Sequence, residues 1–276
     1  AQIIRDFAFS GGIENAFYFN LMIGLSIATL SGIVIIGGLK RIAKASAWLV
    51  PIMGGIYIAA AIIIMLLNFS SVPAAIGSIF IDAFSGSAVI GGTFMGVLIY
   101  GIQRGAFSNE AGIGTEALVH GAAKTNNPIN QGMVAMIGPI FDTLMVCTAT
   151  AIVIILSGLW ADSSFEGATL TAQAFQKMLG APGTAIVFLS VLLFGISTIF
   201  TYSYYGSSCA RFIFGPNSQR IYLYIFIAFI VFFSVISLES AINIIDGSFA
   251  MMAIPTLISS LVLAPKVMQK VKEVLA

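Results

Sequence analysis

Long apolar runs constrain the fold of this chain more than any other feature of its sequence. Of its 276 residues, 59% are hydrophobic and only 8% are charged, whereas a soluble domain is about a quarter charged. Only helices and closed barrels satisfy every backbone polar group in lipid. Barrel strands alternate over about 10 residues, and these runs are longer and do not alternate. We therefore predict an all-α integral membrane protein.

The apolar runs mark about seven membrane spans, since a helix needs roughly 20 apolar residues to cross the hydrocarbon core. We place them at residues 17–38, 48–67, 92–121, 132–156, 184–209, 221–237 and 244–263. The third of these is interrupted by polar residues and glycines. Residues 1–13 resemble the tail of an earlier helix, and 72–87 and 167–179 are predicted to be short interfacial helices.

The distribution of lysine and arginine predicts the orientation in the membrane. Basic residues occupy alternate loops: Lys40, Arg41 and Lys44, then Lys124, then Arg211 and Arg220, then Lys266, Lys270 and Lys272. The intervening loops carry Asp82, Asp162, Glu166 and Glu239, with Lys177 as their one basic residue. The basic loops and the C-terminus are thus expected to be cytoplasmic, in a multi-pass protein of the cell membrane.

The net charge and the few cysteine and histidine residues bear on nucleic-acid binding, disulfides and metal centres. The net charge of +1 gives no sign of nucleic-acid binding. Cys147 and Cys209 lie in or at the end of apolar runs, and His120 cannot form a zinc site alone, so we expect no disulfide, no metal centre and no cofactor. No obligate protein partner is evident. The chain begins at Ala1 without a signal peptide, and we expect the natural protein to begin earlier.

Charges lie within the most apolar part of the chain, in the segment RGAFSNEAGIGTEALVHGAAKTNNP that begins at Arg104. Arg104 and Glu110 fall inside the interrupted span, and Asp142 lies about ten residues into the next one. A charge at the bilayer centre costs about 2.5–3.5 kcal/mol on insertion scales, so such residues face a cavity or one another. We predict that Asp142 neutralises Arg104, with Glu110 as the alternative partner. These three residues are candidates for a buried-charge or gating role.

Glycines explain the interruption. Gly101, Gly105, Gly112 and Gly114 each weaken a helix by about 1 kcal/mol relative to alanine. Ser108 and Asn109 can also compete for backbone hydrogen bonds. Two half-helices with an unwound middle are expected, and unwound backbone at this depth is tolerated only where it lines a cavity. Such a break suits an anion at a half-helix N-terminus and a small cation at the freed carbonyls. The alternative is a kinked structural helix with an internal ion pair.

A second polar cluster lies in FGISTIFTYSYYGSSC, which begins at Phe194. Ser197 and Thr198 offer uncharged oxygen ligands for sodium. Thr198 and Tyr202 are one turn apart and share a helix face. The alternative for this cluster is helix packing through small residues.

Together these segments resemble the sodium:alanine symporters, also called alanine or glycine:cation symporters. The stretch RGAFSNEAGIG matches the signature of that family, and QGMVAMIGPIFDTLMVCTATAIVIILSG, IIGGLKRIAKASAWLVPIM and STIFTYSYYG follow its pattern. The resemblance implies a LeuT-like fold of two inverted five-helix repeats. Residues 1–70 would be the last helices of an incomplete first repeat. Residues 71–276 would be the second repeat, with its discontinuous helix at about 92–121. The discontinuous helix of the first repeat is missing, so this chain alone is not expected to transport.

The resemblance also implies a function and a site. The function is sodium-coupled import of a small amino acid, alanine or glycine, by alternating access. The implied substrate-binding residues are Gln2, Phe107, Ser108, Asn109, Gly112, Thr198 and Tyr202, and the sodium candidates are Ser197 and Thr198. Tyr202 stands where the family often has tryptophan, and Thr115-Glu116 replaces a usual pair of small residues.

Two other classes of function are alternatives. A channel or an amino-acid-sensing receptor could use the same midplane pocket, although no soluble output domain is visible. An intramembrane enzyme lacks support, because no Ser–His or paired-aspartate arrangement is evident.

Overall fold

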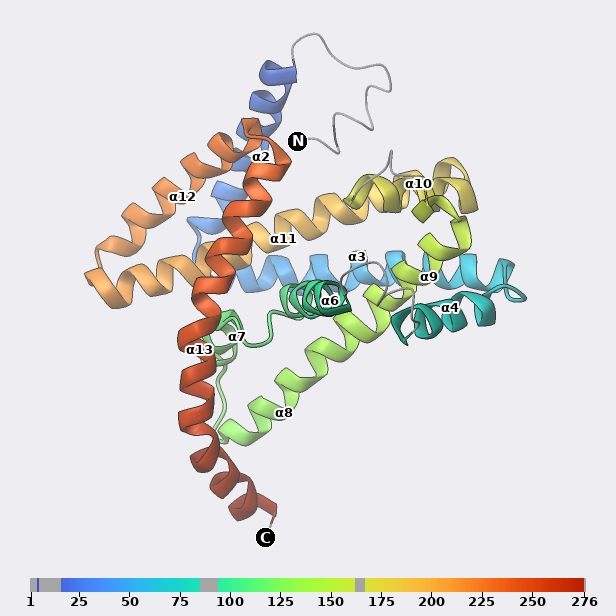
Figure 1. Cartoon of the computed structure of the whole chain (residues 1–276). Coiled ribbons are helices and arrows are strands. Elements are labelled where there is room, and N and C mark those ends of the chain that lie inside the picture. The colour runs from blue at the N-terminus through green and yellow to red at the C-terminus, as the bar shows by residue number, and fades with distance from the viewer. Residues whose placement is uncertain (1–3, 5–15, 85–93, 162–166, 276) are drawn as a thin grey trace. The chain divides into compact units, whose positions relative to one another are not determined.

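The computed structural model describes residues 4, 16–84, 94–161 and 167–275, and every regular element in this part of the chain is helical (Figure 1). The elements are α2 (Ala16–Ile35), α3 (Leu39–Leu67), α4 (Val72–Phe84), α6 (Phe94–Asn109), α7 (Thr115–His120), α8 (Pro128–Pro139), the π-helix η1 (Ile140–Cys147), α9 (Thr148–Ser157), the 3₁₀ turn η2 (Leu159–Ala161), α10 (Gly167–Leu179), α11 (Ala181–Phe214), α12 (Ser218–Val235) and α13 (Leu238–Leu275).

Six helical segments of the described residues are long and apolar enough to cross a membrane. They are Phe17–Ile35, Leu39–Leu67, Pro128–Ser157, Ala181–Phe214, Ser218–Val235 and Glu239–Val274. They confirm the prediction of an all-helical, multi-pass membrane protein. The remaining predicted span, 92–121, is divided into α6 and α7, as its glycines indicated.

The predicted start of one span was wrong. Lys40, Arg41 and Lys44 were assigned to a loop before residue 48, but α3 already begins at Leu39 and contains them. The structure gives a reason for this compact connection. Arg41 Nη1 donates to the carbonyl of Ile33 at 2.8 Å, which satisfies one of the free carbonyls at the end of α2. A basic side chain at this position caps the preceding helix while it begins the next one.

The chain divides into two compact units, of which the first comprises Ala1–Val72 and Ala149–Ala241. In its described part, α11 packs against α2, α3, α10 and α12, and α12 also packs against α2. Ile35, Ile42 and Phe200 form a buried cluster. Two buried hydroxyls of α11 bond within their own helix, with Ser197 donating to Phe194 O and Ser203 to Phe200 O. Small side chains that satisfy themselves in this way allow helices to approach closely.

Helices α11 and α12 approach closely at Gly206, and this contact provides a prediction. A Cβ added there would overlap the hydroxyl of Tyr222 on α12, whereas a Cβ at Gly195 of the same helix would meet no atom within 4 Å. We expect Gly206→Ala to lower the thermal stability of the purified protein, because overpacking costs about 1–3 kcal/mol. Gly195→Ala is the matched control and should not destabilise. Equal melting temperatures for the two variants would show that the α11–α12 approach is not tight.

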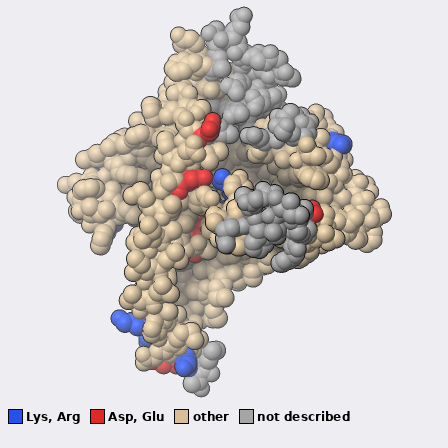
Figure 2. Space-filling view, viewed as in Figure 1, with Lys and Arg blue, Asp and Glu red and all other residues tan. Residues whose placement is uncertain are grey.

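The second unit comprises Pro73–Thr148 and Ile242–Ala276. In its described part, α6 packs against η1, and α7 packs against α8. Charged side chains are sparse on the visible face, and basic ones gather at the C-terminal end of α13, which carries Lys266, Lys270 and Lys272 (Figure 2). Charged side chains within the apolar segments of this unit are therefore unusual.

Candidate functional site

The helix break between α6 and α7 is the first feature of the site. Three of its residues adopt positive φ: Glu110 at 57°, Gly112 at 83° and Gly114 at 92°. Glycine tolerates this region, but for Glu110 it costs about 1–2 kcal/mol. The turn is held by Ala111 N, which donates to Asn109 Oδ1 at 3.0 Å, and by Ile113 N, which donates to Glu110 O at 3.3 Å. The break is thus a defined conformation.

Helix α13 lies against one side of this break. A Cβ on Gly114 would lie 2.5 Å from Thr256 Oγ1, so a side chain there would force Thr256 or the backbone to shift. The side chains of Ile113 and Thr115 on either side are buried. The hydroxyl of Thr115 finds no hydrogen-bond partner among the described residues. The packing of α13 therefore fixes the path of the backbone through the break.

The break also leaves backbone amide and carbonyl groups without hydrogen-bond partners in the helix. The amides of Gly112 and Gly114 donate to no acceptor in the part of the chain that the structure describes. The last carbonyls of α6 lose their helical partners where the helix ends at Asn109. Donors and acceptors thus lie within a few residues of each other, next to the side chains of Phe107 and Ser108.

A polar cluster joins the end of α6 to η1, and we call it the Asp142 cluster. The hydroxyls of Ser108 and Thr143 both donate to Asp142 Oδ2, the second at 3.2 Å. Asn109 Nδ2 donates to Thr143 Oγ1 at 3.2 Å, and Ser108 Oγ lies 3.1 Å from Cys147 Sγ. One carboxylate is thus surrounded by small polar groups from two helices.

Sequence reasoning missed the winding of the segment that carries Asp142. Residues Ile140–Cys147 form a π-helix that directly follows Pro139. The hydroxyl of Thr148 donates to the carbonyl of Thr143 at 3.3 Å. Proline lacks a backbone N–H and disturbs regular α-helix, so Pro139 was the signal that could have indicated an irregular turn. π-turns are frequent at functional sites.

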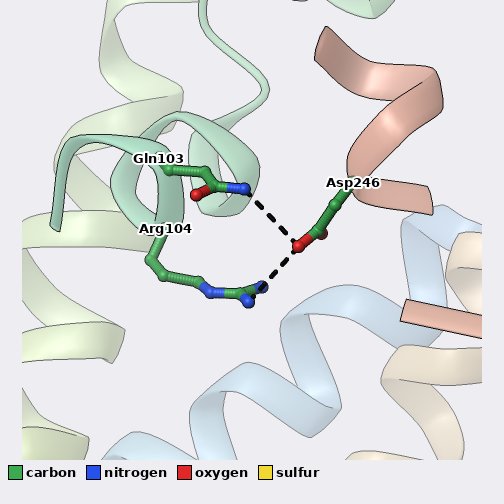
Figure 3. A network of polar contacts seen from close by, with 3 residues as sticks. All are labelled: Gln103, Arg104 and Asp246. Atoms are coloured by element: carbon green, nitrogen blue, oxygen red, sulfur yellow. Dashed lines mark hydrogen bonds and ion pairs between the residues drawn. The ribbon is translucent and has the colours of Figure 1, made fainter. Parts of the chain in front are cut away.

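The predicted pairing of Asp142 with Arg104 was wrong. Arg104 Nη2 instead lies 3.5 Å from Asp246 Oδ2 on α13, and Gln103 Nε2 donates to the same oxygen at 3.4 Å (Figure 3). The guanidinium of Arg104 also lies 4.9 Å from the ring centroid of Tyr100.

Arg104 pairs with Asp246 because Arg104 lies on the face of α6 that meets α13. Phe107, three residues from Arg104 and therefore its neighbour on the helix surface, packs against Phe249 of α13 with 4.9 Å between ring centroids. Asp246 was not among the residues expected from the sequence, although a carboxylate near the start of the predicted span 244–263 was a usable signal.

The other predicted site residues are placed as follows. Gln2 lies outside the described residues. Thr198 and Tyr202 lie on α11 in the first unit, where Thr198 is exposed and the ring of Tyr202 is 5.2 Å from that of Tyr205. Ser197 is buried, and its hydroxyl is bonded within the helix at 2.8 Å. Phe107, Ser108, Asn109 and Gly112 all lie at the end of α6 or in the break.

The model of the sodium:alanine symporter family matches residues 2–275. The chain belongs to the sodium:alanine symporter family. The stretch RGAFSNEAGIG, residues 104–114, forms the C-terminal part of α6 and the break.

Curated relatives of this symporter-family chain carry several descriptions. It is 36% identical over 273 residues to the uncharacterized transporter YflA of Bacillus subtilis, covering 96% of this chain and 58% of the relative. It is 36% identical over 255 residues to the sodium/alanine symporter AgcS of Methanococcus maripaludis (91% and 56%). It is 31% identical over 263 residues to the probable sodium/glutamine symporter GlnT of Bacillus subtilis (94% and 55%). The chain therefore spans little more than half the length of these relatives.

Proposed function

We propose that the protein containing this chain is a secondary active transporter that couples sodium entry to uptake of a small amino acid. Family membership supports the class of activity, and the relatives named for sodium and alanine or glutamine support the two solutes. Alanine or glycine is our proposed substrate. In the LeuT-like arrangement that the family resemblance implies, residues 71–276 would form the second inverted repeat.

The observation that carries this proposal is the break at Glu110–Gly114. A zwitterionic amino acid needs hydrogen-bond donors for its carboxylate and acceptors for its ammonium group. The amides of Gly112 and Gly114 supply donors, and the carbonyls at the end of α6 supply acceptors. Discontinuous helices of transporters bind substrates through such half-helix ends.

The family resemblance assigns the residues near the break to the substrate. Phe107 would border the substrate side chain, with Ser108, Asn109 and Gly112 bordering its polar groups. The family resemblance further assigns Thr198 and Tyr202 on α11 to the substrate, and Ser197 with Thr198 to sodium. These assignments are part of the proposal.

Reconstitution tests the function. The full-length protein in liposomes should accumulate labelled alanine above its equilibrium level when sodium is high outside, and should not do so when choline replaces sodium. Unlabelled glycine, alanine and glutamine compete to rank the substrates. A channel would equilibrate alanine without accumulating it, and a sensor would bind alanine without flux. Either result would overturn the symporter proposal.

The orientation is also part of the proposal, and it makes a prediction. The basic start of α3 would face the cytoplasm and its far end the outside, following the distribution of lysine and arginine. In a background lacking Cys147 and Cys209, an impermeant thiol reagent added to intact cells should label Ser71→Cys but not Lys44→Cys. Both native side chains are exposed, so access from the aqueous side decides the result. Labelling of Lys44→Cys alone would reverse the orientation.

A further inference from the structure

We infer that the Asp142 cluster is a binding site for a sodium ion, held by the carboxylate of Asp142 and the hydroxyl oxygens of Ser108 and Thr143. This inference deepens the proposed function and rests on it for its role in transport. The site differs from the sodium candidates suggested by sequence, Ser197 and Thr198, which lie on α11.

The charge of Asp142 is the first reason. Among the described residues, no lysine, arginine or histidine nitrogen comes within 4.0 Å of the Asp142 carboxylate. Arg104, which the sequence suggested as its partner, is paired with Asp246. An ionised carboxylate inside a membrane span costs several kilocalories per mole without a counter-charge. Two hydroxyl hydrogen bonds reduce that cost but leave the negative charge, which a bound cation would neutralise.

Ligand chemistry is the second reason. Sodium is a hard cation that prefers oxygen ligands, as carboxylate, carbonyl and hydroxyl groups provide. The hydroxyls of Ser108 and Thr143 both reach Asp142 Oδ2, and each hydroxyl oxygen has lone pairs besides the proton it donates. Asn109 donates its amide to Thr143 Oγ1, which orients that oxygen. Cys147 is a soft ligand and would border the ion without binding it.

The backbone that carries these groups is the third reason. Asp142 and Thr143 lie in the π-helix Ile140–Cys147, where the regular α-helical bonds are replaced. The carbonyl of Thr143 accepts a bond from the hydroxyl of Thr148 five residues later. Such a carbonyl is a further oxygen that can turn toward an ion, which a carbonyl held in a regular α-helix cannot do as easily.

The position of the site explains how the ion would act on the substrate. Ser108 and Asn109 are the last residues of α6, and Asn109 Oδ1 also accepts the amide of Ala111 inside the break. An ion that fixes Ser108 and Asn109 therefore fixes the start of the break, whose amides would bind the substrate carboxylate. By linkage, the substrate must strengthen sodium binding by the same factor as sodium strengthens substrate binding.

The test is sodium binding without amino acid. Binding of radioactive sodium to the full-length protein in choline buffer free of other sodium is measured for the wild type, Asp142→Asn and Ser203→Ala. We expect Asp142→Asn to bind one ion fewer per protein. Ser203→Ala should bind as the wild type does, because the Ser203 hydroxyl is bonded to Phe200 O within α11 and belongs to no proposed site. Thr143→Val keeps the shape of threonine but removes an oxygen, and should weaken sodium affinity about tenfold or more, the scale seen when groups around metal sites are removed. Thr143→Ser should retain it.

The results distinguish failure of the sodium site from failure of the proposed transport function. An unchanged number of bound ions and unchanged affinity in both Asp142→Asn and Thr143→Val would overturn the site, even if the protein transports alanine. If the protein binds sodium through Asp142 but moves no amino acid, the site stands and the proposed function fails. If sodium does not bind and the wild type takes up one proton that Asp142→Asn does not, the cluster is a proton site and the sodium inference is overturned. Should Asp142→Asn fold poorly, Thr143→Val and Thr143→Ser are compared instead. Weaker sodium affinity in Thr143→Val alone supports the site, and equal affinity in the two variants contradicts it.

Discussion

The Asp246→Asn variant is expected to be markedly less stable than the wild type, and Arg104→Gln in the same chain is expected to restore much of the loss. Asp246 is the carboxylate that meets Arg104 at 3.5 Å. Without it, Arg104 keeps a charge within an apolar segment, which costs about 2.5–3.5 kcal/mol on insertion scales. The side chain of Arg104 is 42% exposed, so we expect a loss nearer ~2 kcal/mol.

Thermal unfolding of purified protein in detergent measures this effect. The control is the double variant Asp142→Asn with Arg104→Gln, in which the two residues are not partners. Its destabilisation should equal the sum of those of the two single variants, because sites without a shared contact add. Rescue in this control, and none with Asp246→Asn, would restore the pairing first expected from the sequence and contradict the structure.

Gly114→Ala is expected to have the largest effect of any single methyl group added in the break. Its φ of 92° costs a residue with a side chain about 1–2 kcal/mol. The new Cβ would also lie 2.5 Å from Thr256 Oγ1, and overpacking adds about 1–3 kcal/mol. The break must shift to relieve both, so we expect a lower folded yield and loss of sodium-driven alanine uptake in liposomes.

Two further variants distinguish the effect of the strained φ from the effect of the clash with Thr256. Gly105→Ala adds the same methyl group in α6, where no atom lies within 4 Å of the new Cβ, and should leave yield and uptake near wild type. Thr256→Ala combined with Gly114→Ala removes the clash but keeps the strained φ, so it should recover part of the yield. Wild-type yield and uptake for Gly114→Ala alone would mean that the break does not have this conformation.

The positions of helices were predictable because lipid permits few alternatives. An apolar run of sufficient length must form a helix there, and the predicted short helix at 167–179 coincides with α10, Gly167–Leu179. The break was predictable from local chemistry, since Gly112 and Gly114 were expected to weaken the helix and α6 ends just before them, at Asn109. The start of α3 was missed because charge was taken to exclude a helix, whereas Arg41 bonds the carbonyl of Ile33 and lies within one.

The charge pairing could not be predicted from depth alone. Arg104, Asp142 and Asp246 all lie in apolar segments, and depth does not say which side of α6 faces which neighbour. Packing decides this, through Phe107 against Phe249 on α13 and Ser108 against Asp142 on η1. The π-helix added to the difficulty, because its winding changes which side chains of residues 140–147 face the same neighbour.

The winding of η1 also decides which of its side chains can meet the same neighbour. Asp142 and Cys147 are five residues apart, and both reach the hydroxyl of Ser108. In a regular α-helix, residues five apart point about 140° away from each other, since each residue turns by about 100°. The i→i+5 bonds of a π-helix instead bring residues five apart close to one line along the helix. A segment wound as regular α-helix could thus present either the carboxylate or the thiol to Ser108, but not both.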